Sequence, residues 1–249
     1  LLAKRASGEV LSVGRSEAAS VRPVTVAVDA RGIRGSVVTP AGTAVLDSRL
    51  VGEHNLENLL VALGVLVGLG FEPAAAAAAL GSAPQVPGRL ERCDDDRDDV
   101  RVLVDYAHTP DALERVLSAV RRVTDGEVIC VFGCGGDRDP DKRPKMGAAV
   151  ANGAARAIVT SDNPRGEDPA AIVRAIVPGF AGSDTPYEIE LDRARAIEKA
   201  VLGARPGDAV VLAGKGHETE QIVGRERRPF DDRVEARRAL ALRRHGEAG

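Results

Sequence analysis

Residues 157–165 read Ala-Ile-Val-Thr-Ser-Asp-Asn-Pro-Arg, a short apolar run followed at once by a polar turn. The turn from Asp162 to Arg165 combines a carboxylate, an amide, a rigid proline and a guanidinium in one loop. Together these groups suit both charges of a small zwitterion such as an amino acid. Asx-Pro turns are common, so the motif alone is weak. It gains weight because three other polar loops also follow apolar runs in the same half of the chain.

The apolar runs around this turn alternate with stretches that are typical of helices. Strands are expected at 102–104, 128–132, 157–160 and 209–213, and helices at 110–122, 144–153, 169–177 and 192–203. A further strand is expected at 187–191 and a surface helix from Asp231 onward. Apolar strands separated by helices predict an α/β fold, with a mostly parallel, Rossmann-like sheet covered on both faces. Ligands of such sheets bind beyond the carboxyl ends of the strands, where the polar loops lie.

The amino-terminal third of the chain has a different pattern. Short valine-rich runs at 24–30, 35–39 and 43–50 predict antiparallel strands, and residues 55–70 predict a largely buried helix. Pro73 opens a second, alanine-rich helix that reaches Leu80. The proline-rich connector at 84–88 then predicts a domain boundary, with one domain at 1–86 and the other at 87–249.

The composition is that of a globular protein, with 44% hydrophobic and 29% charged residues. Apolar stretches fall short of the ~18 residues of a membrane span and no signal peptide opens the chain, so no membrane partner is expected. The chain has many arginines, but the acidic residues exceed the basic ones and the net charge is −3. No stripe of basic residues is present, so nucleic acid is not expected as a partner either. Cys93, Cys130 and Cys134 fit no zinc or disulfide spacing, which suits the cytoplasm.

The first polar loop of the carboxyl-terminal half, Asp105 to Asp111, follows the strand at 102–104. Thr109 can cap the next helix, with Pro110 at its first position and Asp111 at the positive end of the helix dipole. Capping leaves Asp105 and His108 unexplained. For these two residues a functional and a structural role both stay open.

The second loop, at 133–138, is the glycine-rich turn Gly-Cys-Gly-Gly-Asp-Arg. Its glycines let backbone N–H groups approach an anion. It is not a Walker-type P-loop, because G-x-x-x-x-G-K-[ST] occurs nowhere in the chain. A solvated loop accounts for Asp141 and Lys142, but less well for Arg138, which directly follows the tight turn.

The remaining motif after a strand is Gly214-Lys215-Gly-His-Glu218. Its glycines permit close backbone approach, Glu218 offers an acceptor for an ammonium group, and a solvated role is open for Lys215. The acidic run at 94–99 contains no pattern that suggests a binding site. It is interpreted as an exposed connector without a role in a site.

At the start of the helix expected at 55–70, the sequence reads His-Asn-Leu-Glu-Asn. The simplest interpretation of Asn55 is a helix cap. Asn58 is expected to be a buried amide, and a buried amide needs partners, which the edge of a purine would supply.

These motifs, together with Gly88-Arg89-Leu-Glu, occur in the order seen in the Mur ligases, and the chain resembles that family from about Val51 to Asp232. The resemblance is closest to the family members that add diaminopimelate to the peptidoglycan stem peptide. It implies that the chain contains the last part of a P-loop-type central ATPase domain and a whole Rossmann-like C-terminal domain. The family's P-loop, carbamylated lysine and main magnesium ligands lie upstream, so no catalytic residue or metal ligand is assigned here.

The resemblance carries over to individual residues only where the motifs match. The positions that resemble the family's diaminopimelate contacts are Arg138, Asp162, Asn163, Pro164, Arg165, Gly214 and Glu218. Those that resemble residues near the nucleotide are Asn55, Asn58, Arg89, Asp105 and His108. The family motif often has a lysine two residues after Arg138, where this chain has Pro140, which leaves Lys142 as a substitute of uncertain role.

The resemblance implies an ATP-driven amide synthesis in the cytoplasm, with ATP and Mg²⁺ as cofactors. The implied partners are the UDP-N-acetylmuramoyl dipeptide, diaminopimelate and ATP, while the oligomeric state and the diaminopimelate isomer stay open. Met146 is the only methionine, so Leu1 is not a translation start. We therefore expect a fragment of a longer chain that is inactive by itself. Two alternatives remain, a ligase similar to folylpolyglutamate synthase and a non-catalytic Rossmann-like binding module.

Overall fold

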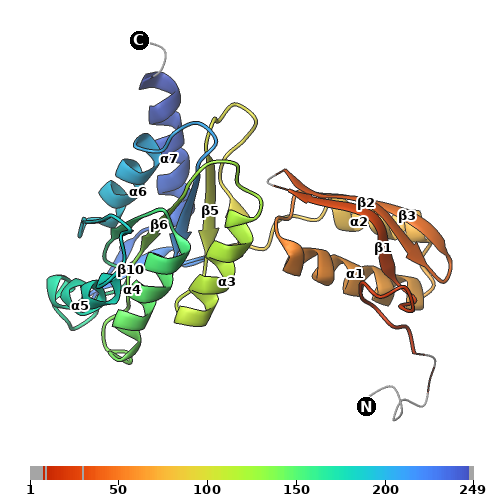
Figure 1. The fold of residues 1–249 in the computed structure, drawn as a ribbon, viewed down its shortest axis with the longest axis horizontal. Coiled ribbons are helices and arrows are strands. Elements are labelled where there is room, and N and C mark those ends of the chain that lie inside the picture. Colours follow the sequence, from red (N-terminus) through yellow and green to blue (C-terminus); the bar gives the residue numbers. More distant parts are fainter. Residues whose placement is uncertain (1–7, 9, 30, 247–249) are drawn as a thin grey trace. The chain divides into compact units, whose positions relative to one another are not determined.

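The computed structural model describes residue 8, residues 10–29 and residues 31–246. The chain forms two compact units, of which unit 1 ends at Gln85 and unit 2 begins at Val86 (Figure 1). Ala30, the expected end of the first strand, and Leu1, on which the start-codon argument rests, lie outside the described residues.

Unit 1 is a three-stranded antiparallel sheet packed against two helices. The strands follow the order β1-β2-β3, and the elements are β1 (Arg22–Asp29), β2 (Gly32–Thr39), β3 (Gly42–Ser48), α1 (Glu53–Gly68) and α2 (Pro73–Gly81). The core between them is aliphatic and includes Ile33, Leu46, Leu60 and Leu63. The strands and helices predicted from the valine-rich runs and from Pro73 are thus confirmed.

Unit 2 is built on a six-stranded sheet with the order β4-β5-β9-β6-β7-β8. Its strands are β4 (Glu91–Arg92), β5 (Arg101–Asp105), β6 (Val128–Phe132), β7 (Arg156–Val159), β8 (Tyr187–Ile189) and β9 (Ala209–Ala213). The pairings from β5 to β8 are all parallel, and the short β4 pairs antiparallel with β5. The chain therefore builds the sheet outward from β5 to β8 and then returns to insert β9 between β5 and β6.

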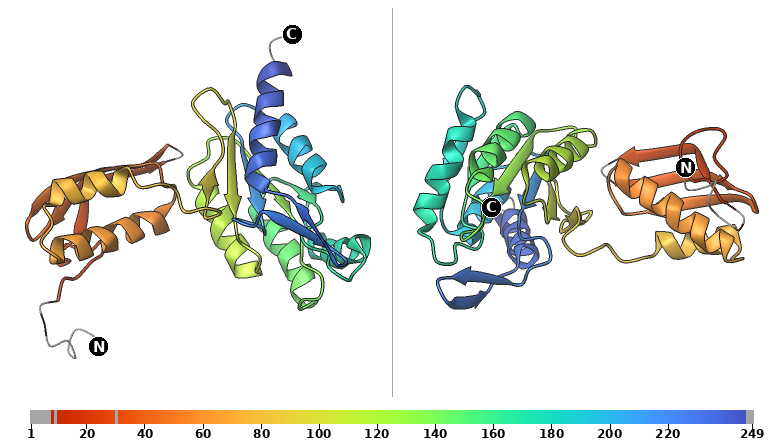
Figure 2. Two further views of the ribbon diagram at one scale, coloured as in Figure 1. Left: turned by 180° about the vertical axis from the view of Figure 1, so that it is seen from behind. Right: turned by 90° about the horizontal axis from the view of Figure 1, so that it is seen from below.

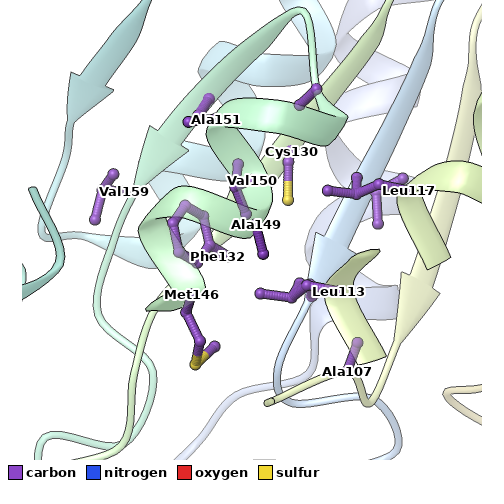
Figure 3. Close-up of a cluster of buried hydrophobic side chains, with 14 of the residues drawn as sticks. Ala107, Leu113, Leu117, Cys130, Phe132, Met146, Ala149, Val150, Ala151 and Val159 are labelled. Atoms are coloured by element: carbon purple, nitrogen blue, oxygen red, sulfur yellow. The ribbon is translucent and has the colours of Figure 1, made fainter. Parts of the chain in front are cut away.

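Helices cover both faces of this sheet (Figures 1 and 2). One face carries α3 (Pro110–Arg121), α4 (Lys142–Gly153), α5 (Pro169–Ile176) and the 3₁₀ helix η2 (Val177–Phe180), and the other carries α6 (Arg193–Leu202) and α7 (Asp232–Gly246). Figure 3 shows Leu113 and Leu117 of α3 gathered with Met146 of α4 and Phe132 of β6 on the first face. The predicted α/β fold with a mostly parallel sheet is confirmed.

Unit 2 also contains a two-stranded sheet that was not predicted from the sequence. It is the hairpin of β10 (Glu220–Val223) and β11 (Glu226–Pro229), drawn in blue in Figure 2. Its residues are mostly polar and exposed, so they lack the apolar alternation by which strands are recognised. The hairpin runs on directly from the loop after β9 and pairs with Arg165 through an isolated bridge.

The acidic run at 94–99 is not simply an exposed connector, and that prediction was wrong. Asp94 is buried, and its carboxylate accepts hydrogen bonds from Arg92 and from the backbone N–H of Val102. Asp99 forms an ion pair with Arg243 of α7. The run therefore anchors the start of β5 and the far end of α7.

The helix expected after Asp231 is confirmed as α7, but it is more than a surface helix. Ala236, Ala239 and Leu240 are buried against the sheet side of unit 2, as are Asp232 and Arg243. None of the helices in the described part of the chain combines the length and apolar composition that a transmembrane span requires.

Candidate functional site

Four polar loops of unit 2 leave the sheet at the same edge. β5, β9, β6 and β7 are neighbours and run parallel, so the loops that follow them lie side by side at their carboxyl ends. Two glycines show how tightly the loops are packed together. A Cβ at Gly136 would lie 1.9 Å from the carbonyl oxygen of Pro164, and one at Gly214 would lie 2.5 Å from Oδ2 of Asp162. The loops after β6, β7 and β9 therefore form one continuous surface.

The loop after β7 is largely buried and is clamped by the β10–β11 hairpin. Asp162, Asn163 and Pro164 are buried, and Arg165 is half-buried with a left-handed φ of 51°. The backbone N–H of Arg165 donates to the carbonyl of Ile222 at 3.0 Å, and its own carbonyl accepts from Gly224. Residues other than glycine rarely adopt a positive φ. These two hydrogen bonds fix Arg165 in that conformation.

The guanidinium of Arg165 is only partly engaged. Its Nη1 donates to the carbonyl of Gly136 at 2.9 Å and more weakly to that of Asn163 at 3.4 Å. Among the described residues, none accepts a hydrogen bond from its Nε or Nη2. Arg138 is exposed, and its one hydrogen bond within the described chain runs from Nη1 to the carbonyl of Asp137 at 3.2 Å. Both guanidinium groups therefore keep donors free for a carboxylate.

Asp162 is a buried carboxylate that has no hydrogen-bond donor of its own in the described part of the chain. Burial raises the pKa of its carboxyl group above the usual value, because water no longer solvates the charge, and the nearby Arg193 and Lys215 offset only part of that rise. A carboxylate in this state gains strongly from an incoming cation. This is the behaviour expected of a group that receives an ammonium ion.

Lys215 is fully buried, so a solvated role is ruled out. Its ammonium donates to Oδ1 of Asn163 at 3.0 Å, to Oε2 of Glu218 at 3.2 Å and to the carbonyl of Glu220 at 2.6 Å. The same Oε2 of Glu218 accepts from Nδ2 of Asn163 at 2.7 Å. The expected acceptor at Glu218 is thus present, and it is held in place by two residues of the chain itself.

The floor of the site contains a buried ion pair that sequence reasoning missed. Arg193, at the start of α6, donates twice to the carboxylate of Asp232 at 2.7 Å, and both side chains are fully buried. Its remaining donors reach the carbonyls of Ala213 at 3.0 Å and Ser161 at 3.4 Å. Ala213 is the last residue of β9 and Ser161 lies in the loop after β7, so the pair ties both regions to α6 and α7.

In the glycine-rich loop, Asp137 has a structural role. Its carboxylate accepts from the N–H of Gly166 at 3.1 Å, and its own N–H donates to Glu167 at 2.6 Å. Glu167 in turn pairs with Arg143 at 2.8 Å. This arrangement holds the loop after β6 against the loop after β7 and leaves Arg138 at its exposed tip.

The residues that resemble nucleotide contacts fall into both units. In unit 2, both carboxylate oxygens of Asp105 accept backbone N–H groups, from Ala107 and Leu90, each at 2.8 Å. That geometry favours the structural role for Asp105. His108 is exposed, with Nδ1 2.8 Å from the carbonyl of Tyr106, and the guanidinium of Arg89 lies 5.3 Å from the centre of the Tyr106 ring. Arg89 and His108 thus both lie against one aromatic ring.

Lys142, the substitute of uncertain role, lies at the start of α4. Its Nζ donates to the carbonyl of His108 at 3.0 Å, which joins the loop after β6 to the loop after β5. Thr109 caps α3 as predicted, since its hydroxyl accepts from the N–H of Ala112. The helix begins at Pro110, so the capping interpretation of this loop is confirmed.

Asn55 and Asn58 belong to unit 1, and two expectations about them were wrong. The helix α1 begins at Glu53 with Gly52 as its cap, so Asn55 lies inside the helix, where its amide donates to the carbonyl of Val51 at 2.8 Å. Asn58 is exposed rather than buried, and its amide donates to Oδ1 of Asn55 at 3.3 Å. The exposed side of the helix accommodates Asn58 without a buried partner, which removes the original argument for a purine.

Within the described residues, no group of three or more histidine, cysteine or acidic side chains could hold a metal ion. The cysteines are free thiols, and burial raises the pKa of Cys134 to about 12, so it is not a thiolate at neutral pH. The carboxylates of Glu218 and Asp105 are instead engaged by lysine, amide and backbone donors.

The profile of one protein family matches residues 88–216, just over half of the chain. Its description is "Mur ligase, glutamate ligase domain". The chain belongs to the Mur ligase family. The matched region contains every strand of the parallel sheet, the loops after β5, β6 and β7, and the start of the loop after β9 up to Gly216, so the family assignment rests on most of the candidate site.

A relative from Gloeobacter violaceus is 50% identical over 226 residues and is named UDP-N-acetylmuramoyl-L-alanyl-D-glutamate–2,6-diaminopimelate ligase. The alignment covers 91% of this chain and 46% of the relative. A solved structure with the same enzyme name in its title is 38% identical, with a TM-score of 0.72, over 92% of this chain and 47% of that one. The chain thus spans about half the length of the Mur ligases that it matches.

A folylpolyglutamate synthase from Mycobacterium tuberculosis also has a similar structure, with a TM-score of 0.60 over 78% of this chain and 45% of that one. Its sequence identity is 23%, so this likeness shows the fold alone. The alternative of a folylpolyglutamate synthase-like ligase is therefore less well supported than the Mur ligase reading.

The features that sequence reasoning missed share a cause. Lys215, Arg193 and Asp232 act through partners that lie far away in the sequence, so no local pattern announces them. A lysine between two glycines and an arginine at the first turn of a helix both look like ordinary surface residues. Only the folded structure shows that these side chains are buried.

Proposed function

We propose that this chain is the amine-substrate half of an ATP-dependent amide ligase that adds diaminopimelate to UDP-N-acetylmuramoyl-L-alanyl-D-glutamate in the cytoplasm. The observation that supports it most is the 50% identity to a relative of that name, which extends through all four loops at the carboxyl edge. We assign residues 1–86 to a partial central ATP-binding domain and 87–249 to the amino-acid-binding domain.

The loops after β6, β7 and β9 would hold diaminopimelate. Diaminopimelate differs from lysine by a second carboxylate at its far end, and the free donors of Arg138 and Arg165 suit that group as planar forks. Asp162, which lacks a hydrogen-bond donor among the described residues, and the free Oε1 of Glu218 would accept the neighbouring ammonium. A site of this kind discriminates against lysine, because lysine leaves the arginines unpaired.

Asn163, Pro164 and Gly214 would shape this site rather than bear its charge. Pro164 and the buried amide of Asn163 give the loop after β7 its conformation. Gly214, with a φ of 115°, lets the loop after β9 approach Asp162. Any side chain at position 214 would occupy the space beside that carboxylate.

ATP, when bound, supplies the phosphoryl group that activates the carboxylate of the acceptor substrate. The residues of this chain that fit contacts to ATP are Arg89 and His108, which are exposed around the Tyr106 ring. We place Asp105 behind them as a support for their loop. Asn55 and Asn58 remain candidates for nucleotide contacts through the family resemblance alone. Mg²⁺ is assigned to none of the described residues, because no cluster of ligands for it is present among them.

A panel of amine substrates tests this proposal. The intact gene product that contains residues 1–249 is supplied with ATP, the UDP-linked dipeptide and either diaminopimelate, lysine or glutamate, and phosphate release is measured. We expect activity with diaminopimelate and at least tenfold less with lysine, whose lost contact is worth more than ~1.4 kcal/mol. In a parallel reaction with a folate acceptor, activity with glutamate would favour the folylpolyglutamate synthase alternative instead. Residues 1–249 alone, which lack a phosphate-binding loop, are the inactive control.

A further inference from the structure

The ammonium group of Lys215 is fully committed to the chain itself. An ammonium has three N–H donors, and Nζ uses one on Asn163, one on Glu218 and one on the carbonyl of Glu220. The side chain is 0% exposed, so no ligand reaches it directly. Lys215 can therefore affect ligand binding only through the residues to which it donates hydrogen bonds.

The first residue it holds is Asn163. Oδ1 of Asn163 accepts from Lys215 and, at 3.0 Å, from the backbone N–H of Ile222 in β10. Two donors on the same oxygen decide which end of the amide is oxygen and which is nitrogen. The NH₂ end is thereby turned toward Glu218, to which one of its two N–H groups donates at 2.7 Å. Asn163 could not turn over without placing its NH₂ group against both the ammonium and an N–H.

The second residue is Glu218. Oε2 accepts from both Lys215 and Asn163, while Oε1 accepts from no described residue, and the side chain is 34% exposed. The carboxylate is therefore fixed at one oxygen and available at the other. The charge of Lys215 also offsets that of Glu218, whereas Arg193 and Lys215 offset only part of the cost of burying Asp162.

From these contacts we propose that Lys215 is a positioning residue that fixes Asn163 and Glu218 and so sets the preference of the site for diaminopimelate over lysine. This inference rests on the function proposed above. Without Lys215, Oδ1 of Asn163 keeps only the N–H of Ile222 and Oε2 of Glu218 keeps only the amide of Asn163 among the described residues, so both side chains are held less firmly. Such a site binds amines more weakly and distinguishes them less well.

The test is the variant Lys215→Met, which keeps the length and removes the charge, in the intact gene product. We expect KM for diaminopimelate to rise on the order of 10- to 100-fold, the size of loss that follows when reacting groups are misplaced by about 1 Å. KM for ATP should stay within about twofold, and the ratio of kcat/KM for diaminopimelate to that for lysine should fall several-fold. An unchanged ratio and an unchanged KM for diaminopimelate in a folded Lys215→Met protein would overturn the inference.

A purely structural role is separated from positioning by a matched control. Arg243 is also a buried cation that binds a carboxylate and backbone carbonyls, but it lies at the amino end of the strands. Arg243→Met should lower the melting temperature and leave the diaminopimelate-to-lysine ratio as in the wild type. If Arg243→Met shifts that ratio as much as Lys215→Met does, the effect is general loosening and the positioning role is refuted.

A double-mutant cycle adds a second readout. If Lys215 acts through Glu218, then Glu218→Gln costs less affinity for diaminopimelate in the Lys215→Met background than in the wild type, because the two residues form one unit. Additive losses would contradict the inference. Should Lys215→Met fail to fold, Lys215→Gln, which keeps two N–H donors without the charge, is expected to show the same fall in the substrate ratio. A wild-type protein that does not use diaminopimelate at all would refute the proposed function itself.

Discussion

The two edges of the sheet in unit 2 differ in how fully their charged side chains are paired. At the amino edge, Arg243 binds Asp99 and the carbonyls of Val201 and Ala204, and both oxygens of Asp208 accept backbone N–H groups. At the carboxyl edge, no described residue donates a hydrogen bond to the buried carboxylate of Asp162, and Arg138 is exposed with one hydrogen bond to the described chain. The amino edge is therefore optimised for stability, while the carboxyl edge keeps unsatisfied charge that a ligand can pair. The predictions below test that division.

The largest effect is expected at the floor of the carboxyl edge. Arg193→Met removes one partner of a fully buried ion pair and leaves Asp232 charged and unpaired, which costs about 3–5 kcal/mol. Thermal unfolding followed by circular dichroism should show a melting temperature lower by roughly 10 °C. A shift below about 2 °C would mean that this buried ion pair contributes little to the stability of unit 2.

The next effect is expected at the amino edge. Arg243→Met breaks the pair with Asp99, which is partly exposed, so we expect a smaller loss of about 2–3 kcal/mol in the free energy of unfolding. Denaturant unfolding measures this loss. Steady-state kinetics of the same variant at a temperature where it is folded should match the wild type. A clear change in KM for diaminopimelate would break the comparison between the edges.

A comparable loss, this time of ligand affinity, is expected from Arg165→Ala. The variant loses a guanidinium whose Nε and Nη2 bind no described residue, so its stability should change little. KM for diaminopimelate should rise roughly 10- to 100-fold, as for loss of a charged hydrogen-bonding pair. The ratio of kcat/KM for diaminopimelate to that for lysine should fall as well. An unchanged KM for diaminopimelate would contradict the assignment of Arg165 as a contact to diaminopimelate.

The smallest effect concerns Asp162 and has the opposite sign for stability. Because its folded pKa is raised, the protonated form is favoured by folding, and this contribution is present below the usual value of 3.8 and lost as the pH rises through the folded pKa. Asp162→Asn cannot ionise, so at neutral pH the variant should melt roughly 2–4 °C higher than the wild type while binding diaminopimelate more weakly. Melting curves at several pH values should show the difference growing across that window. A variant that melts lower at neutral pH would contradict the burial argument.

The fold was largely predictable because its signals are local. β6 and β9 have the bounds expected from their apolar runs, Val128–Phe132 and Ala209–Ala213, and Thr109 and Pro110 mark the start of α3. The β10–β11 hairpin was not predictable, because its exposed polar strands carry no periodic signal. Burial of Asp94 was missed for a related reason, since a run of aspartates usually lies in solvent.

The grouping of the candidate residues at one edge of the sheet was predictable from the sequence, but the contacts between them were not. The turn at 162–165, Arg138 and Glu218 were all proposed from motifs, and the parallel sheet brings their loops to one edge. The helix start at Gly52 corrected the role of Asn55, and the exposure of Asn58 removed its purine argument. Both errors arose because a helix boundary and the side of a helix that faces the core depend on packing as well as on sequence.

The sequence by itself determined the alternation of strands and helices, the parallel sheet and the motifs that mark a Mur ligase, because apolar periodicity and capping act between near neighbours. Only the tertiary structure decided which charges are paired and which are left for a ligand. The partners of Lys215 and Arg193 lie 52 and 39 residues away, in Asn163 and Asp232. The cost of burying a charge depends on such distant partners, so the distinction between a supporting ion and a binding ion exists only once the loops have met.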